Sequence, residues 1–160
     1  MINNVRYLFF DWGDTLMVDY PQYSGAMATW PQITLMKGVI ELLPQLSKKY
    51  KCVVLSNAVE SDAGLMKQAF EKVNLDNYFC LFTTSKELGA KKPEKAFFKN
   101  ALNRIGASAD EVIMIGNDYE KDIESAKAVG LDTILISQQV GKFPSADYVI
   151  EDFSKLNFLL

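Results

Sequence analysis

Short hydrophobic runs recur along the chain and alternate with longer stretches in which hydrophobic residues return every three or four positions. A run that is apolar at every position, rather than at alternate ones, predicts a strand buried on both faces of a sheet. The runs of this kind cover residues 5–10, 52–55, 78–82, 112–115, 133–136 and, more briefly, 148–150. The pattern therefore predicts a sheet whose strands are mostly covered on both sides.

Helical spacing of the hydrophobic residues marks the stretches between these runs. The stripes lie within residues 39–46, 65–73, 96–105 and 123–129. Gly106 and Gly130 follow the third and fourth stripes, as glycine commonly follows a helix, whereas Pro44 inside the first predicts a kink or an early end. Strands that alternate with helices favour a parallel sheet with helices on both faces. We expect a single domain over residues 1–160.

Residues 17–36 break this alternation and predict an irregular flap, a loop or very short helix of about twenty residues. Prolines and a glycine are interspersed there with aromatic residues, and loops of this length in compact domains are more often functional than not. The aromatic residues in and beside the flap are Trp12, Tyr20, Tyr23 and Trp30. They either line an entrance to a site or pack the flap onto the domain.

Polar residues gather just after the predicted strands. They are Asp11 and Asp14 after the first, Ser56 and Asn57 after the second, Lys92 between the third and fourth, and Asn117, Asp118 and Asp122 after the fourth. Taken singly, each has an ordinary explanation as a helix cap, a turn residue or an exposed lysine. Because ligands of open α/β sheets bind beyond the carboxyl ends of the strands, their order along the chain indicates one shared site.

The donor types of this group limit its chemistry. Converging carboxylates repel one another unless a cation lies among them, and oxygen ligands without His or Cys suit Mg²⁺ rather than zinc. A phosphoryl group would complete the metal shell, with the lysine offsetting its charge. One aspartate could attack phosphorus and form an aspartyl phosphate.

The composition excludes several other chemistries. The 160 residues contain no histidine, so a Ser-His-Asp triad, a Cys-His pair and an imidazole zinc site are all excluded. The formal net charge of −3 argues against a nucleic-acid partner, which needs a basic face.

Cysteine use and hydropathy predict the compartment. Cys52 and Cys80 lie inside apolar runs, which predicts buried free thiols in a reducing compartment. No apolar stretch reaches about 18 residues, and the N-terminus lacks the features of a signal peptide. We therefore expect a cytoplasmic protein with no membrane partner.

The segments around these polar residues resemble the four motifs of the haloacid dehalogenase superfamily, whose members are mostly Mg²⁺-dependent phosphatases. They read FFDWGDTL, VVLSNA, GAKKPEKAFF and VIMIGNDYEKDIESAKAVG, and together they extend over almost the whole chain. The resemblance implies an α/β fold, a three-layer, Rossmann-like, doubly wound parallel sheet in which residues 17–36 form a rudimentary cap.

The resemblance also implies a role for each matching residue. Asp11 would be the nucleophile and a metal ligand, the Gly13 carbonyl a second ligand and Thr15 a support for the loop. Ser56, with Asn57 beside it, would bind the phosphoryl oxygens, and Lys92 would balance the charge of both the nucleophile and the substrate. For the remaining metal ligand two alignments are open, since Asn117 occupies the usual aspartate position or Asp118 and Asp122 form the acidic pair.

Gly13 is the main departure from the family pattern. The first motif usually reads Asp-x-Asp, and its second aspartate protonates the leaving group; here an acid follows one position later, as Asp14. A shift of one residue re-aims the side chain, so Asp14 is only a candidate for that catalytic role. The chain is therefore either a slow phosphomonoester hydrolase or a catalytically impaired domain that serves as a binding or scaffolding module.

The short insert between the first two motifs bears on partners. An open site cannot exclude water or enclose a small molecule unaided. We expect a phosphorylated substrate, small or macromolecular, and a homo-oligomer that closes the site. A two-component receiver domain is disfavoured, because receivers carry the phosphorylated aspartate after the third strand and this chain has Thr83, Thr84 and Ser85 there.

Overall fold

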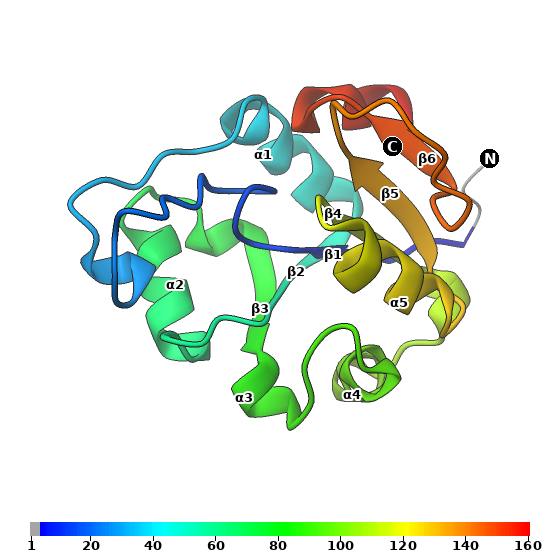
Figure 1. Ribbon diagram of the computed structural model, residues 1–160, viewed down its shortest axis with the longest axis horizontal. Helices are drawn as coiled ribbons and strands as arrows, with labels where there is room; N and C mark the ends of the chain where they lie inside the picture. Colours follow the sequence, from blue (N-terminus) through cyan, green and yellow to red (C-terminus); the bar gives the residue numbers. More distant parts are fainter. Residues whose placement is uncertain (1–3) are drawn as a thin grey trace.

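A single six-stranded parallel sheet forms the centre of the molecule (Figure 1). The computed structural model describes residues 4–160. The strands are β1 (Tyr7–Phe10), β2 (Lys51–Ser56), β3 (Phe79–Thr84), β4 (Val112–Gly116), β5 (Asp132–Ile136) and β6 (Tyr148–Ile150), in the order β3-β2-β1-β4-β5-β6. This arrangement confirms the predicted doubly wound α/β fold.

Helices cover both faces of the sheet. The α-helices are α1 (Val39–Lys49), α2 (Ala63–Glu71), α3 (Ser85–Leu88), α4 (Lys95–Ile105) and α5 (Ser125–Lys127), and a π-helix, Tyr119–Glu124, runs directly into α5. Short 3-10 helices lie at Met27–Thr29, Asp76–Tyr78, Ala109–Glu111 and Phe153–Phe158. The early end expected at Pro44 is wrong, because α1 continues through it to Lys49.

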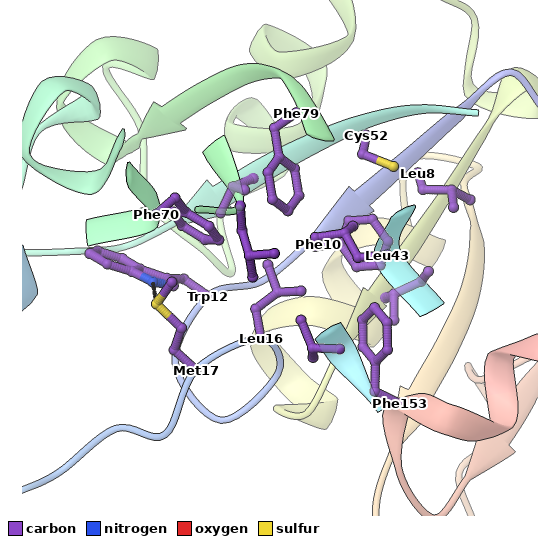
Figure 2. Packing of buried hydrophobic residues seen from close by; sticks show 14 of the residues in the cluster. Leu8, Phe10, Trp12, Leu16, Met17, Leu43, Cys52, Phe70, Phe79 and Phe153 are labelled. Carbon is purple, nitrogen blue, oxygen red and sulfur yellow. Dashed lines mark hydrogen bonds between the residues drawn. The ribbon is translucent and has the colours of Figure 1, made fainter. Parts of the chain in front are cut away.

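The hydrophobic core is divided in two by the sheet. Leu8 and Phe10 of β1 point toward α1, α2 and the C-terminal 3-10 helix, where the Phe10 and Phe153 rings lie 5.6 Å apart (Figure 2). Tyr7 and Phe9, at the alternate positions, pack against α4 and α5 on the other face. Burial on both faces accounts for the continuous apolar runs of the sequence.

The flap, residues 17–36, contains only the 3-10 helix Met27–Thr29 as regular structure. Its two ends are tied together, since the Val18 N–H donates to the Thr34 carbonyl and the Met36 N–H to that of Leu16. Met17 and Leu35 also form an isolated antiparallel bridge. The flap is thus anchored as one loop at the edge of the domain.

The thiols differ in exposure. Both cysteines are free, as expected; Cys52 is buried, but the prediction that Cys80 is buried is wrong. Cys80 lies on β3, an edge strand of the sheet. Across residues 4–160, none of the helices combines the length and the apolarity required to traverse a bilayer.

Candidate active site

The candidate site lies where three neighbouring strands end. β1 pairs with β2 on one side and with β4 on the other, so the residues that follow these strands meet at one edge. They border a cleft of about 360 Å³, here called the Asp11 cleft. Its lining includes Asp11, Gly13, Asp14, Asp19, Ser56, Asn57, Lys92, Asn117, Asp118 and Asp122. The structure therefore brings all the candidate residues of the sequence to one cleft.

Lys92 lies between two carboxylates at the base of the Asp11 cleft. Its Nζ is 2.7 Å from Asp11 Oδ1 and 2.6 Å from Asp122 Oδ1, and the residue is only 4% exposed. Burial alone would lower the pKa of Lys92, but the two carboxylates outweigh burial and raise it above its ordinary value. The carboxylates of Asp11 and Asp122 and the ammonium of Lys92 together carry a formal charge of −1. A bound divalent cation would change the net charge of this group to +1.

Asn57 holds the backbone of Lys92 in place. The Asn57 side-chain N–H donates to the Lys92 carbonyl and its oxygen accepts from the Lys92 N–H, both at 2.8 Å. The Lys92 ammonium also lies 5.8 Å from the centre of the Phe97 ring, on α4. The end of β2 thus positions the lysine that reaches Asp11.

Asp122 reaches the site because the chain forms a π-helix after β4. Residue Asp122 is fully buried, and its Oδ2 accepts a hydrogen bond from the Asp118 N–H at 3.1 Å. Burial, reinforced by the charge of Asp11, raises the pKa of Asp122 despite the nearby Lys92. A Cβ placed on Gly116 would lie 2.3 Å from Asp122 Oδ2, so only glycine leaves room for this carboxylate.

Asp118 has a different position from the other carboxylates. Its side chain accepts from the Lys121 N–H at 3.0 Å, which caps the π-helix, and it lies 3.6 Å from the Lys121 ammonium. An aspartate after a strand often plays this capping role. Asp118 therefore borders the Asp11 cleft without joining the Asp11–Lys92–Asp122 cluster.

Asn117 lies against the other oxygen of Asp11. One terminal atom of its amide is 3.2 Å from both Asp11 Oδ2 and the Gly13 carbonyl oxygen. If this atom is the amide nitrogen, it donates a hydrogen bond to each of these two oxygens. If it is the amide oxygen, it lies beside the Asp11 and Gly13 oxygens with too few hydrogen-bond donors among the three. The buried Thr15 hydroxyl lies 3.1 Å from the same atom and orients the amide in either case.

This oxygen set fits a small hard cation. Neighbouring ligands of octahedral Mg²⁺ are about 3 Å apart when each bond is about 2.1 Å, close to the separations found around Asn117. No group of three or more His, Cys, Asp or Glu side chains suited to a metal occurs within residues 4–160. The candidate ligands are instead one carboxylate, one carbonyl and one amide, from Asp11, Gly13 and Asn117.

Asp14 faces the beginning of the flap. Its backbone is left-handed, with φ of 59°, and its Oδ1 accepts from the Asp19 N–H at 2.9 Å. Ser56, at the end of β2, accepts from the Ala58 N–H and borders the Asp11 cleft. Asp14 thus supports the flap backbone, while Ser56 lies where a bound oxyanion would contact β2.

Asp19 is a cleft residue that the sequence did not indicate. It lies in the flap, five positions after Asp14, and only folding brings it over Gly13. Partial burial, together with the charges of Asp14 and Asp11, raises the pKa of its carboxyl group. The only available signal was an acidic residue in an otherwise mostly apolar part of the flap.

A second cavity of about 420 Å³ adjoins the Asp11 cleft and is here called the aromatic cavity. Trp12, Tyr23 and Trp30 contribute to its wall. Tyr20 packs against Tyr23, with ring centres 5.3 Å apart, and Trp12 also stacks on Phe70 of α2 in the core. Trp12, Tyr23 and Trp30 therefore line a cavity, and of the flap aromatics Trp30 also packs against the core of the domain.

Comparison with known families agrees with this geometry. The family model described as "Haloacid dehalogenase-like hydrolase" matches residues 3–136, most of the chain. This chain belongs to the haloacid dehalogenase-like hydrolase family. The resemblance of the four motifs is thereby confirmed. The individual roles assigned to the site residues stay predictions.

Proteins that are similar in sequence to this chain include several named as phosphatases. The chain is 31% identical over 152 residues to ribulose-1,5-bisphosphate 5-phosphatase of Halopiger xanaduensis, covering 89% of this chain and 63% of that protein. It is 29% identical over 131 residues to glyceraldehyde 3-phosphate phosphatase of Methanothermobacter thermautotrophicus, covering 74% and 55% respectively. The chain thus spans about half to just under two thirds of the length of these relatives.

Solved structures of similar proteins share the haloacid dehalogenase-like fold. An uncharacterized protein from Listeria monocytogenes serotype 4b superposes with a TM-score of 0.83 at 24% identity, covering 97% of this chain and 96% of that chain. A HAD phosphatase from Thermococcus onnurineus gives a TM-score of 0.80 at 16% identity, covering 97% of both chains. At these identities the likeness concerns the fold alone.

Proposed function

We propose that the chain is a Mg²⁺-dependent phosphomonoester hydrolase that acts through an aspartyl phosphate on Asp11. The observation that carries this proposal is the buried Lys92, whose ammonium lies 2.7 Å from Asp11 and 2.6 Å from Asp122 beyond the central strand. A lysine in this position balances the charge that a phosphoryl group brings to Asp11. The relatives named as phosphatases support the same class of reaction.

Each residue of the Asp11 cleft has a defined task in this proposal. The Asp11 carboxylate attacks phosphorus, Lys92 offsets the charge of the phosphoryl oxygens, and Ser56 donates a hydrogen bond to one of them. Asn57 acts at a distance by holding the Lys92 backbone. A Mg²⁺ ion held by Asp11, the Gly13 carbonyl and Asn117 would add the positive charge that the three-residue cluster lacks.

The substitution of Gly13 for the usual acid favours a second candidate function, a binding or scaffolding module. General acid–base help contributes about 10²–10⁴ in rate, so its loss would leave a slow enzyme or none. Such a module would retain the Asp11 cleft and bind a phosphorylated partner without hydrolysing it. The two candidates differ in turnover, whereas binding of Mg²⁺ and a phosphoryl mimic is common to both.

We further propose a cytoplasmic setting and a phosphorylated substrate, either a small molecule or a macromolecule. The flap leaves the Asp11 cleft joined to the aromatic cavity, and the two have volumes of about 360 and 420 Å³. A substrate larger than a simple phosphate ester, or a second copy of this chain, would cover this surface and exclude water.

The experiment is a Mg²⁺-dependent assay of the chain against a broad panel of phosphate monoesters. We expect turnover that is abolished by Asp11→Asn and retained by the control Asp132→Asn. Asp132 is the first residue of β5, so it lies at the opposite end of the parallel strands from the Asp11 cleft. Absence of turnover with every ester would refute the hydrolase. A rise in melting temperature with Mg²⁺ and BeF₃⁻ under those conditions would then indicate the binding module.

A further inference from the structure

The space above Gly13 is occupied by a carboxylate from the flap. A Cβ placed on Gly13 would lie 3.3 Å from the Asp19 Cβ and 3.6 Å from Asp19 Oδ2. Asp19 is held there through its backbone, since its N–H donates to Asp14 Oδ1 at 2.9 Å. The Asp19 side chain therefore approaches the very place from which a side chain at position 13 would extend.

The other carboxylates of the Asp11 cleft are already engaged. Asp11 and Asp122 bind Lys92, and Asp14 accepts from the backbone of Asp19. Asp118 caps the π-helix. By contrast, no group within residues 4–160 donates a hydrogen bond to the carboxylate of Asp19 or forms an ion pair with it.

Asp19 also lies at the junction of two cavities. It borders the Asp11 cleft, and it borders the aromatic cavity together with Trp12 and Tyr23. A phosphoryl group beside Asp11 and Lys92 would place its ester oxygen toward this junction, with the leaving group extending into the aromatic cavity. Of the carboxylates around the Asp11 cleft, Asp19 is the one that stands at this junction with no hydrogen-bond partner.

We propose that Asp19 is the general acid and base of the hydrolysis, in place of the residue that is absent at position 13. This assignment rests on the proposed function. As Asp11 attacks phosphorus, the P–O bond to the leaving group breaks, its electron pair remains on the leaving oxygen, and Asp19 gives that oxygen a proton. Water then attacks phosphorus in the aspartyl phosphate and gives a proton back to Asp19. The bond between phosphorus and the Asp11 oxygen breaks, so inorganic phosphate is released and the Asp11 carboxylate is regenerated.

The leaving group provides the decisive test. A p-nitrophenolate leaves without a proton, whereas an alkoxide needs one, so a lost general acid slows alkyl esters selectively. We expect Asp19→Asn to lower kcat/KM for an alkyl phosphate such as glycerol 2-phosphate by about 10²–10⁴. The expected loss for p-nitrophenyl phosphate is less than about tenfold, and Asp132→Asn should resemble the wild type with both esters.

A compensating substitution tests the location of the carboxylate. The double variant Gly13→Asp with Asp19→Ala restores a carboxylate beside the space that the Asp19 carboxyl group has vacated, while the Cβ of position 19 stays 3.3 Å from the new Cβ. We expect it to hydrolyse the alkyl ester at least about tenfold faster than Asp19→Ala alone, within the contribution of an acid–base group. A double variant no faster than Asp19→Ala would contradict action from this position.

Three results would overturn the assignment of Asp19. The first is an Asp19→Asn variant that loses nothing while Asp11→Asn is inactive, and the second is an equal loss with both esters, which indicates a structural role. The third is a leaving-group-selective loss in Asp14→Asn instead, which would assign the proton transfer to Asp14. If the wild-type chain hydrolyses no ester, the proposed function fails, and the assignment fails with it.

Discussion

Gly116→Ala tests whether close packing at the end of β4 positions the charged cluster. The new Cβ would lie 2.3 Å from Asp122 Oδ2, 2.5 Å from its Cγ and 2.6 Å from its Cβ. The Asp122 side chain cannot move away without losing a hydrogen bond, because Lys92 binds one of its oxygens and the Asp118 N–H binds the other. The substitution must therefore displace either the backbone of β4 or the Asp122 carboxylate.

The cost can be worked out from these contacts. Insertion of a methyl group into a packed interior costs about 1–3 kcal/mol, and breaking a buried ion pair about 3–5 kcal/mol. Lys92 keeps its bond to Asp11, so we expect a net loss of about 3 kcal/mol in the free energy of unfolding. For a chain of this size that corresponds to a fall in melting temperature of about 6–12 °C.

The assay is thermal unfolding of matched glycine variants. Gly64→Ala is the control, because its Cβ would meet only Asp62 Oδ1 at an ordinary 3.4 Å and alanine favours the helix. Asp122→Gly provides a second background, in which Gly116→Ala should be much less costly, since all three side-chain atoms that the new Cβ meets are gone. Equal costs in both backgrounds, or a melting temperature for Gly116→Ala within about 2 °C of the wild type, would refute the reasoning.

Further predictions concern the thiols and the metal ligands. Burial raises the pKa of Cys52 to about 12, from 9.0, so this thiol ionises in the unfolded chain before it ionises in the folded one. The free energy of unfolding should therefore fall as the pH rises from 9.0 toward 12. Melting temperatures measured across this pH range should fall less in Cys52→Ala than in the wild type. In the folded chain a thiol reagent should modify Cys80 before Cys52. Asn117→Asp should tighten Mg²⁺ binding about tenfold by calorimetry, because a carboxylate replaces an amide, and unchanged affinity would argue against its place in the metal shell. Asp118→Ala should cost about 1 kcal/mol of stability through the lost cap of the π-helix, with less effect on Mg²⁺ affinity than Asn117→Ala.

The strands β1, β2, β4 and β5 were predictable because they are almost entirely buried, so hydrophobicity alone marks them. The same reasoning failed for Cys80, since β3 is an edge strand and one side of it is accessible. It also failed at Pro44, where packing of α1 on the core overrides the local penalty of proline.

The candidate site was predictable as a set of residues, but the part that each plays was not. Asp118 and Asp122 are four positions apart, and the π-helix buries one while the other becomes its cap. Which of the two joins Lys92 depends on that local winding, for which the hydrophobic pattern carries no signal. Asp19 was missed for a related reason, because its approach to Gly13 depends on the path of an irregular loop.

The flap closes on itself through the bonds between Val18 and Thr34 and between Leu16 and Met36. Because both of its ends leave the domain at nearly the same point, the loop can be exchanged for another of different length without shifting the strands beneath it. The same loop carries Asp19 and part of the aromatic wall. A grafted loop would therefore alter leaving-group preference and proton transfer together, while Asp11 and Lys92 kept their geometry.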